Sequence, residues 1–69
     1  MNASAYTYRA FFHNGRRAFM GEETTQIQRA EMDARRIISE NDLPEMHIQR
    51  ALGYGTKWET VNTLKAYTR

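Results

Sequence analysis

An Asn-Gly pair lies between two runs of alternating apolar and polar residues, and it constrains the fold of this chain more than any other feature. Asn14 and Gly15 both tolerate the positive φ of a type I′ turn, which joins two antiparallel strands by a two-residue loop. The sequence therefore predicts a β-hairpin, with a first strand over about residues 5–13 and a second over about residues 16–24.

The hairpin side chains divide between two faces, because successive residues of a strand point to opposite sides. A turn centred on the Asn-Gly pair sets Phe12 opposite Arg17 and Ala10 opposite Phe19. The predicted core face is the aromatic one, with Tyr6, Tyr8, Ala10, Phe12, Phe19 and Gly21. The other face mixes basic, polar and apolar residues, namely Thr7, Arg9, Phe11, His13, Arg16, Ala18, Met20 and Glu22. We expect this second face to be exposed to water.

A helix is predicted to begin at Gln26. Thr25 and Gln28 match the capping-box pattern, and Glu22 and Glu23 precede the helix, where its dipole favours negative charge. Apolar residues at helical spacing form one stripe, which consists of Ile27, Ala30, Ala34, Ile37 and Ile38. We expect this stripe to pack on the aromatic face of the hairpin.

Two further strands are predicted after the helix. The helix is expected to end at the Leu43-Pro44 step, because the residue before a proline avoids the helical conformation. A third strand follows over about 45–52, and a turn at 53–56 leads to a fourth strand over about 57–64.

The fourth strand has a competing interpretation. The register of the second hairpin is favourable, since it pairs Arg50 with Glu59, Ile48 with Val61 and Ala51 with Trp58. A C-terminal helix is the alternative, because Thr56 and Glu59 match a capping box and apolar residues recur every three positions. The β-branched residues Thr60, Val61 and Thr63 favour the strand.

These elements predict a single α+β domain over residues 1–69, in the order β-β-α-β-β, with an antiparallel sheet and one helix packed on one face. Residues 1–4 are expected to be frayed. A chain of 69 residues buries only roughly 60% of the surface that its unfolded form exposes, so its stability is expected to be marginal.

Composition narrows the class of protein. The absence of cysteine excludes disulfides and thiolate metal sites, and two histidines alone do not make a metal site. No apolar run approaches the roughly 18 residues that span a bilayer, and the N-terminus lacks an apolar signal region. We expect a soluble cytoplasmic protein without cofactor or metal. The net charge of +2 gives no strong global field, although Arg9, Arg16 and Arg17 cluster on the hairpin.

No residue pattern of the chain predicts catalysis. Ser4 and Ser39 lie in the expected tail and on a helix flank without a motif around them, and His13 and His47 lie beside a turn and in a half-exposed strand. The glycine-rich turn at 53–56 lacks the spacing of a phosphate-binding loop and is expected to join two strands. We therefore expect a non-enzymatic protein.

The basic and aromatic face of the first hairpin is the first candidate binding surface. Its candidate residues are Arg9, Phe11, His13, Arg16, Arg17 and Met20. Guanidinium groups that bind phosphate, together with a ring that stacks on bases, are typical of single-strand nucleic-acid sites. The same composition is typical of protein interfaces. A third explanation is that the chain terminus or the second subunit of a homodimer covers the apolar residues.

The outer face of the second hairpin is another candidate surface. It consists of His47, Gln49, Ala51, Trp58, Thr60 and Asn62, with Tyr54 at the turn. Trp58 is costly to leave in water without a partner, and a register slip of one residue would place it in the core. Tyr54 and Trp58 therefore join the candidate partner-binding residues.

The layout of the chain resembles small phage-encoded inhibitors. A hairpin begins near Ala5-Tyr6, an acidic entry at 22–25 leads to a helix segment at 34–37, and a second hairpin closes the chain. Type I-F anti-CRISPR proteins and podophage inhibitors of bacterial RNA polymerase are similar in size and layout. The resemblance implies a non-enzymatic protein that inhibits a larger host complex by occupying its surface.

From these observations we expect a small binding protein whose partner is a host protein or ribonucleoprotein complex, such as a CRISPR effector or RNA polymerase. Direct binding of nucleic acid through the basic aromatic hairpin is the alternative. A steep loss of binding between low and physiological salt would indicate the alternative, because phosphate contacts release counterions.

Overall fold

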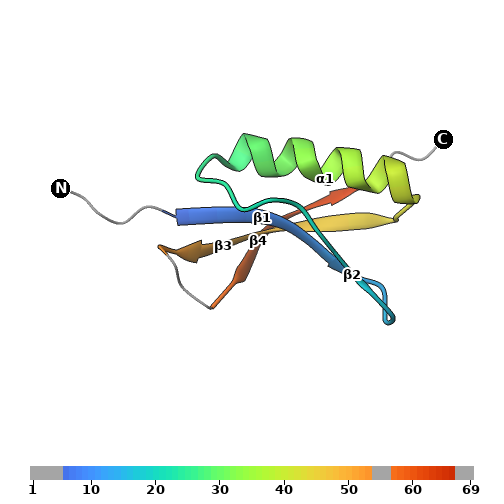
Figure 1. Cartoon of the computed structure of the whole chain (residues 1–69), viewed down its shortest axis with the longest axis horizontal. Helices are drawn as coiled ribbons and strands as arrows, with labels where there is room; N and C mark the ends of the chain where they lie inside the picture. The colour runs from blue at the N-terminus through green and yellow to red at the C-terminus, as the bar shows by residue number, and fades with distance from the viewer. Residues whose placement is uncertain (1–5, 54–56, 67–69) are drawn as a thin grey trace.

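A four-stranded antiparallel sheet carries one helix on one of its faces (Figure 1). The computed structural model describes residues 6–53 and 57–66. The elements in chain order are β1 (Tyr6–His13), β2 (Ala18–Met20), α1 (Ile27–Asn41), β3 (Glu45–Leu52) and β4 (Glu59–Lys65). The predicted α+β fold with the order β-β-α-β-β is confirmed.

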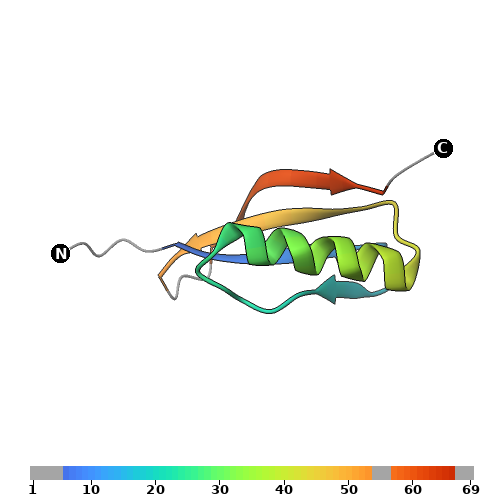
Figure 2. The same cartoon turned by 90° about the horizontal axis from the view of Figure 1, so that it is seen from above.

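The strands are arranged in the order β2-β1-β3-β4, so the first strand lies in the interior of the sheet. β1 pairs with β3 over Tyr6–Phe11 and with β2 over Phe11–His13. Since β2 and β3 are both antiparallel to β1, they run parallel to each other, and α1 makes the crossover between them. Seen from above, the helix lies over β1 and β3, with β2 and β4 on either side (Figure 2).

The first hairpin exists, but the predicted two-residue turn is wrong. Phe12 pairs with Phe19, two residues beyond the predicted partner, and the loop contains residues 14–17. The Asn14 side-chain oxygen Oδ1 accepts the N–H groups of Arg16 at 2.9 Å and Arg17 at 3.0 Å, and only Gly15 has a positive φ in this loop, of 94°. An Asn side chain that holds its own loop replaces the type I′ turn. Because the shift is even, each side chain keeps its predicted face.

The second strand is shorter than predicted and ends in a bulge. β2 stops at Met20, Gly21 N–H still donates to the Ala10 carbonyl at 3.0 Å, and Thr24 rejoins Tyr8 through two backbone hydrogen bonds of 2.7 and 2.9 Å. Glu22 and Glu23 therefore lie in an extra loop beside α1.

Gly21 marks the closest approach of this edge to the helix. A Cβ at position 21 would lie 2.9 Å from the Cβ of Asp33, closer than two carbon atoms can approach without movement. Asp33 also accepts the Glu22 N–H at 3.3 Å. Glycine at this position thus allows the strand to pass directly under α1.

The helix ends agree with the predicted positions but not with the predicted cap. Gln26 is the N-terminal cap residue and forms no side-chain cap, so the capping box of Thr25 and Gln28 is wrong. Instead, the Thr24 hydroxyl accepts the Gln26 N–H at 3.1 Å. At the other end Asp42 adopts a left-handed conformation with φ of 56°, and the Leu43 N–H donates to the Ile38 carbonyl, which closes the last turn.

The core lies between α1 and the sheet. Ala10, Met46 and Ile48 are fully buried on the sheet side, and Ala30 and Ala34 are fully buried on the helix side. The small side chains of Ala10, Ala30 and Ala34 allow the helix backbone to approach the strands closely. The remaining core residues are Phe19, Ile37, Ile38 and Leu43, with Tyr8, Phe12, Ile27, Leu64 and Ala66 packed against them. The helix stripe is therefore confirmed, and so are Tyr8, Ala10, Phe12 and Phe19 of the predicted core face. Tyr6 was also predicted there but is 37% exposed, so its assignment to the core is wrong.

The C-terminal segment is a strand, so the alternative of a C-terminal helix is wrong. Arg50 pairs with Glu59 as predicted, whereas Ile48 pairs with Asn62 and not with Val61. A bulge between the pairs of Ile48 and Gln49 inserts one extra residue into β4 and leaves Val61 38% exposed. The predicted pair of Ala51 and Trp58 lies outside the ladder.

Candidate functional site: the open face of the sheet

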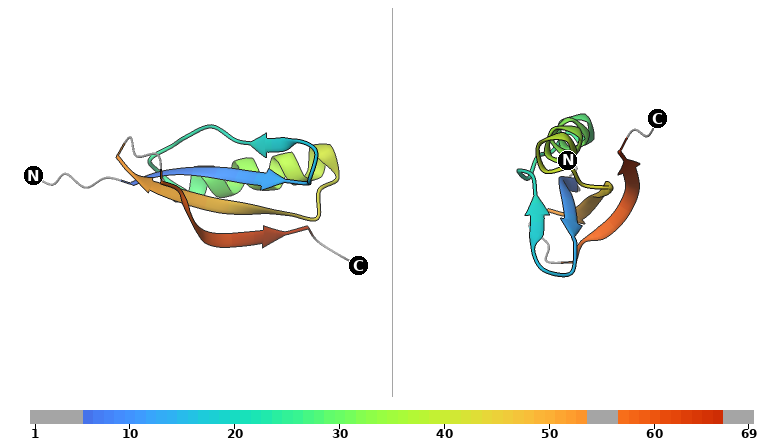
Figure 3. Two further views of the ribbon diagram at one scale, coloured as in Figure 1. Left: turned by 90° about the horizontal axis from the view of Figure 1, so that it is seen from below. Right: turned by 90° about the vertical axis from the view of Figure 1, so that its right-hand side faces the viewer.

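The face of the sheet opposite α1 is not covered by any described segment, as the end-on view shows (Figure 3). Strand register places on it side chains from both hairpins, because β1 and β3 are neighbours. We call it the open face and define it by its central residues Arg9, Phe11, Met20, His47, Gln49 and Trp58. The two candidate surfaces of the sequence are therefore one surface.

Arg9 is the centre of the open face. Its guanidinium carbon lies 4.1 Å from the ring centroid of Trp58 and 5.2 Å from that of Phe11. Its Nε donates to Gln49 Oε1 at 2.9 Å, and its Nη1 lies 3.6 Å from the Met20 sulfur. Three strands and the residue before β4 thus hold one guanidinium group by stacking and hydrogen bonding, which fixes its plane.

His47 stands beside this cluster on β3. Its Nδ1 lies 2.9 Å from the Thr63 hydroxyl, and its Nε2 lies 3.6 Å from the Glu45 carboxylate. Glu45 is the only carboxylate that the register of the described strands places on the open face, and it lies opposite Lys65. The negative charge of this carboxylate is therefore offset by a neighbouring cation.

The two edges of the sheet are poor sites for an added strand. β2 has only three residues and is followed by the acidic bulge. On β4, the Thr63 N–H donates to its neighbour Asn62 Oδ1 at 2.9 Å, so this donor is not free for another chain. Short, bulged or internally satisfied edges resist strand pairing, which leaves the open face as the surface available to a partner.

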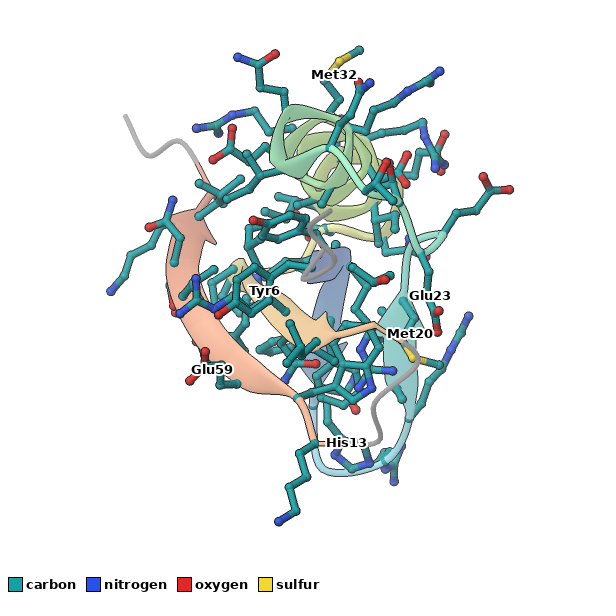
Figure 4. The ribbon with its side chains drawn as sticks, turned by 90° about the vertical axis from the view of Figure 1, so that its left-hand side faces the viewer. Tyr6, His13, Met20, Glu23, Met32 and Glu59 are labelled. Carbon is teal, nitrogen blue, oxygen red and sulfur yellow. The ribbon has the colours of Figure 1, made fainter. Side chains whose placement is uncertain are left out.

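The remaining predicted site residues lie around the hairpin loop or outside the described part. His13 is exposed at the end of β1, where its Nδ1 accepts the Gly15 N–H at 3.0 Å, and Arg16 is exposed in the loop. Figure 4 shows His13 and Met20 on the side away from Met32, which projects from the helix. The guanidinium carbon of Arg17 lies 4.4 Å from the Phe19 ring centroid, on the core-facing side, so the structure does not bring Arg17 to the open face.

Tyr54 lies outside the described residues. Of the second predicted surface, Asn62 belongs to the helix side, since it pairs with Ile48 after the bulge. Gln49 was placed on this surface by alternation alone, but its hydrogen bond to Arg9 depends on the pairing of β1 with β3. No local pattern in the sequence indicates that pairing.

Charge is divided unequally between the helix segment and the strands. Residues 22–42 contain six acidic and three basic side chains, a net charge of −3, whereas the rest of the chain contains seven basic and two acidic side chains, a net charge of +5. The division places the negative charge on the helix side of the molecule. The strands and their loops carry the positive charge.

The cations of the two sides also differ in their pairing. On the helix, Arg36 pairs with Asp33 at 3.2 Å and with Glu40 at 3.3 Å, and the hydrogen bond that Arg36 donates to Asp33 raises the pKa of Arg36 above its usual value. Arg50 pairs with Glu59 at 2.6 Å, and this hydrogen bond likewise raises the pKa of Arg50. Within residues 6–53 and 57–66, Arg9 and the loop arginines Arg16 and Arg17 have no carboxylate partner.

Two of the hollows in the described surface border α1. One of about 420 Å³ lies between the end of α1 and the residue after β4, lined by Arg35, Ile38, Ser39, Asp42, Leu43 and Ala66. A second of about 260 Å³ lies beside the acidic bulge. In the part of the chain that the structure describes, no three carboxylate or imidazole side chains converge as they would on a metal ion.

Comparisons of the chain with models of protein families, with curated proteins and with solved structures find no match. The fold defines a small α+β domain with one helix on an antiparallel sheet. The resemblance in layout to phage inhibitors remains a hypothesis. No helix among the described residues is long and apolar enough to cross a membrane.

Proposed function

We propose that this chain is a non-enzymatic binding protein that acts by occupying a surface of a larger macromolecular complex, with the open face of its sheet as the contact surface. The observation that carries the proposal is the cluster around Arg9, in which two aromatic rings and a guanidinium group gather on a face that no described segment covers. Aromatic residues, arginine and methionine are enriched in protein interfaces, and tryptophan and arginine also in their hot spots.

The solvent side of α1 is a weaker candidate contact surface. Met32 is the most exposed large apolar residue, at 69%, but it stands alone on the solvent side of α1. The helix arginine Arg36 is engaged by carboxylates of its own helix. An isolated apolar side chain or an internally paired cation adds little to a protein interface.

The complex that we propose as a partner is a nucleic-acid machine of a host cell, such as a CRISPR effector or RNA polymerase, which is the class that the resemblance to phage inhibitors implies. Inhibition by such a small domain requires only that it block access to the surface it covers. Direct nucleic-acid binding is the second candidate, and the positive charge of the strand region favours it.

Affinity capture from a bacterial lysate tests the proposal with matched baits. Wild type, Phe11→Ala and Met32→Ala baits are compared, because the two substitutions each remove one large apolar side chain from opposite sides of the molecule. The proposal predicts that a macromolecular complex is captured by wild type and Met32→Ala, is lost with Phe11→Ala, and is inhibited in its own activity by wild type. Equal recovery by all three baits would overturn it.

A further inference from the structure

The residues of the open face indicate the chemical class of its partner. We infer that the segment that lies against the open face is a single strand of nucleic acid; this inference rests on the proposed function, which assigns the open face as the contact surface. The inference follows from the rings of Phe11 and Trp58, the unpaired cations around them and the polar residues between them.

The two rings form a stacking platform that is held in place before any ligand binds. Phe11 and Trp58 are both half-buried and flank the same guanidinium group, whose Nε is fixed by Gln49. Bases of a single strand stack on such rings and on the planes of arginine side chains. Among the described residues, no acceptor contacts the Nη2 group of Arg9, which leaves it able to donate to a phosphate or a base edge.

Charge indicates an acidic ligand. Among the described residues, the strand region carries six basic and two acidic side chains, a net charge of +4, and within residues 6–53 and 57–66 Arg9 and Arg16 have no carboxylate partner. The one carboxylate of the open face, Glu45, lies opposite Lys65. A polyanion therefore meets attraction along this face, whereas the acidic helix side repels it.

The neutral residues of the open face distinguish a nucleic acid from an acidic protein. Besides its two rings and Met20, this face presents hydrogen-bonding side chains, including Gln49, Thr60 and Thr63. These side chains are polar, whereas the core of a protein interface is predominantly apolar, at about 65% non-polar area. Unstacked bases offer many donors and acceptors on their edges, and amide and hydroxyl side chains can bond to them.

A duplex does not fit the same features. In double-stranded DNA the bases are stacked on one another, so rings on a broad sheet face reach only the backbone. The use of Phe11 and Trp58 thus requires a single strand, whether DNA or RNA.

Direct titration tests the inference, and the single tryptophan of the chain provides the signal. A mixed-sequence single-stranded DNA, the same sequence as RNA and the matching DNA duplex are each added to wild-type protein at about 50 mM salt, and Trp58 fluorescence is recorded. We expect quenching by a single strand, and binding that falls steeply as salt is raised to about 200 mM. The preferred strand, DNA or RNA, identifies the source of the ligand.

Matched variants separate the contribution of stacking to affinity from that of charge. Their binding to a labelled oligonucleotide is measured by fluorescence anisotropy. Phe11→Ala is expected to weaken binding at least about fivefold, and Met32→Ala to leave it unchanged. Arg16→Glu is expected to weaken binding and to lower the salt slope by about 1, whereas Arg29→Glu, the same charge change on the exposed side of α1, has a smaller effect. Circular dichroism confirms that each variant is folded, and Trp58→Phe, which keeps a ring, is expected to retain binding.

Four results would overturn the inference: no binding of any single strand at about 50 mM salt, equal affinity for the duplex, equal competition by polyglutamate, or a dimer with the open face at its interface. The proposed function fails separately. If lysate capture depends on Phe11 but survives nuclease treatment and no oligonucleotide binds, the open face contacts protein, so the proposed function stands and this inference falls. If capture is independent of Phe11, the proposed function itself is overturned.

Discussion

The two faces of the same sheet are built on different principles. On the helix side, the central residues Ala10 and Ile48 are fully buried and close to small helix residues, and the cation Arg36 is paired with carboxylates. On the open face, Met20 is 54% exposed and Arg9 is stacked between rings without a carboxylate. The helix side stabilises the fold, while the open face keeps polar and aromatic groups available to a ligand.

The two faces should therefore respond differently to substitution. Residues that hold the helix on the sheet contribute to the free energy of unfolding, and we propose that residues of the open face contribute mainly to binding. A small domain has only about 5–15 kcal/mol of stability in total, so the difference between the two faces should be directly measurable.

The largest effect is expected from the helix side. Ile48→Ala removes a fully buried side chain next to Ala10 and leaves a cavity, which should lower the free energy of unfolding by about 2–5 kcal/mol. Met20→Ala, on the open face, should lower it by less than about 1 kcal/mol, because this side chain is already half in water. Urea denaturation followed by circular dichroism measures both, and equal losses would contradict the division between the faces.

The next largest loss of stability is expected at Gly21, where the segment after β2 contacts α1. Gly21→Ala places a Cβ 2.9 Å from the Cβ of Asp33, so the strand and helix must separate, at a cost of about 1–3 kcal/mol. Gly53→Ala is the control variant. Gly53 has φ of 59° but open space around its Cβ position, so this substitution strains the backbone without a steric clash. If Gly21→Ala were neutral in urea denaturation, the close approach of this edge to the helix would be wrong.

A smaller loss of stability is expected from the centre of the open face. Arg9→Ala removes a guanidinium stacked on Phe11 and Trp58, which should cost about 1 kcal/mol in the free energy of unfolding. Arg9→Lys keeps the charge but loses the planar group and its several N–H donors. It should therefore lower the affinity for a ligand more than it lowers the free energy of unfolding. A loss for Arg9→Ala as large as that for Ile48→Ala would show that the open face is part of the core.

The smallest effect is expected on the solvent side of α1. Arg36→Gln breaks two ion pairs, with Asp33 and with Glu40. The Arg36 side chain is 55% exposed, so water already screens both pairs, although Asp33 is only 26% exposed. No change in the urea midpoint should be resolved at physiological salt. A clear destabilisation there would mean that the helix depends on its surface charges more than on its buried alanines.

Most of the fold followed from local patterns in the sequence. Alternation placed Phe12 and Phe19 toward the core and Phe11 away from it, and the helix stripe and the third strand were located correctly. These predictions succeeded because binary patterning depends on near neighbours in the chain. The orientation of each hairpin therefore did not require knowledge of the sheet order.

The failures have two physical causes. The four-residue loop at 14–17 is held by the Asn14 side chain, which replaces the type I′ turn. The bulge after Gly21 and the extra residue Val61 lie where the segment meets the helix or a neighbouring strand. The pairing of β1 with β3, which brings Arg9 to Trp58, joins residues 36 to 46 positions apart and leaves no local signal. The face on which each of these side chains lies was thus predictable, whereas their convergence was not.

The most direct test of the account is a titration of isotope-labelled protein with mixed-sequence single-stranded DNA, followed through its amide and side-chain NMR signals. We predict changes at the Arg9 Nε–H, the Trp58 indole N–H and the amides of Phe11 and Gln49, with the signals of α1 unchanged. Changes confined to α1 or to the acidic bulge, or no change at about 50 mM salt, would contradict the assignment of the open face as the binding surface.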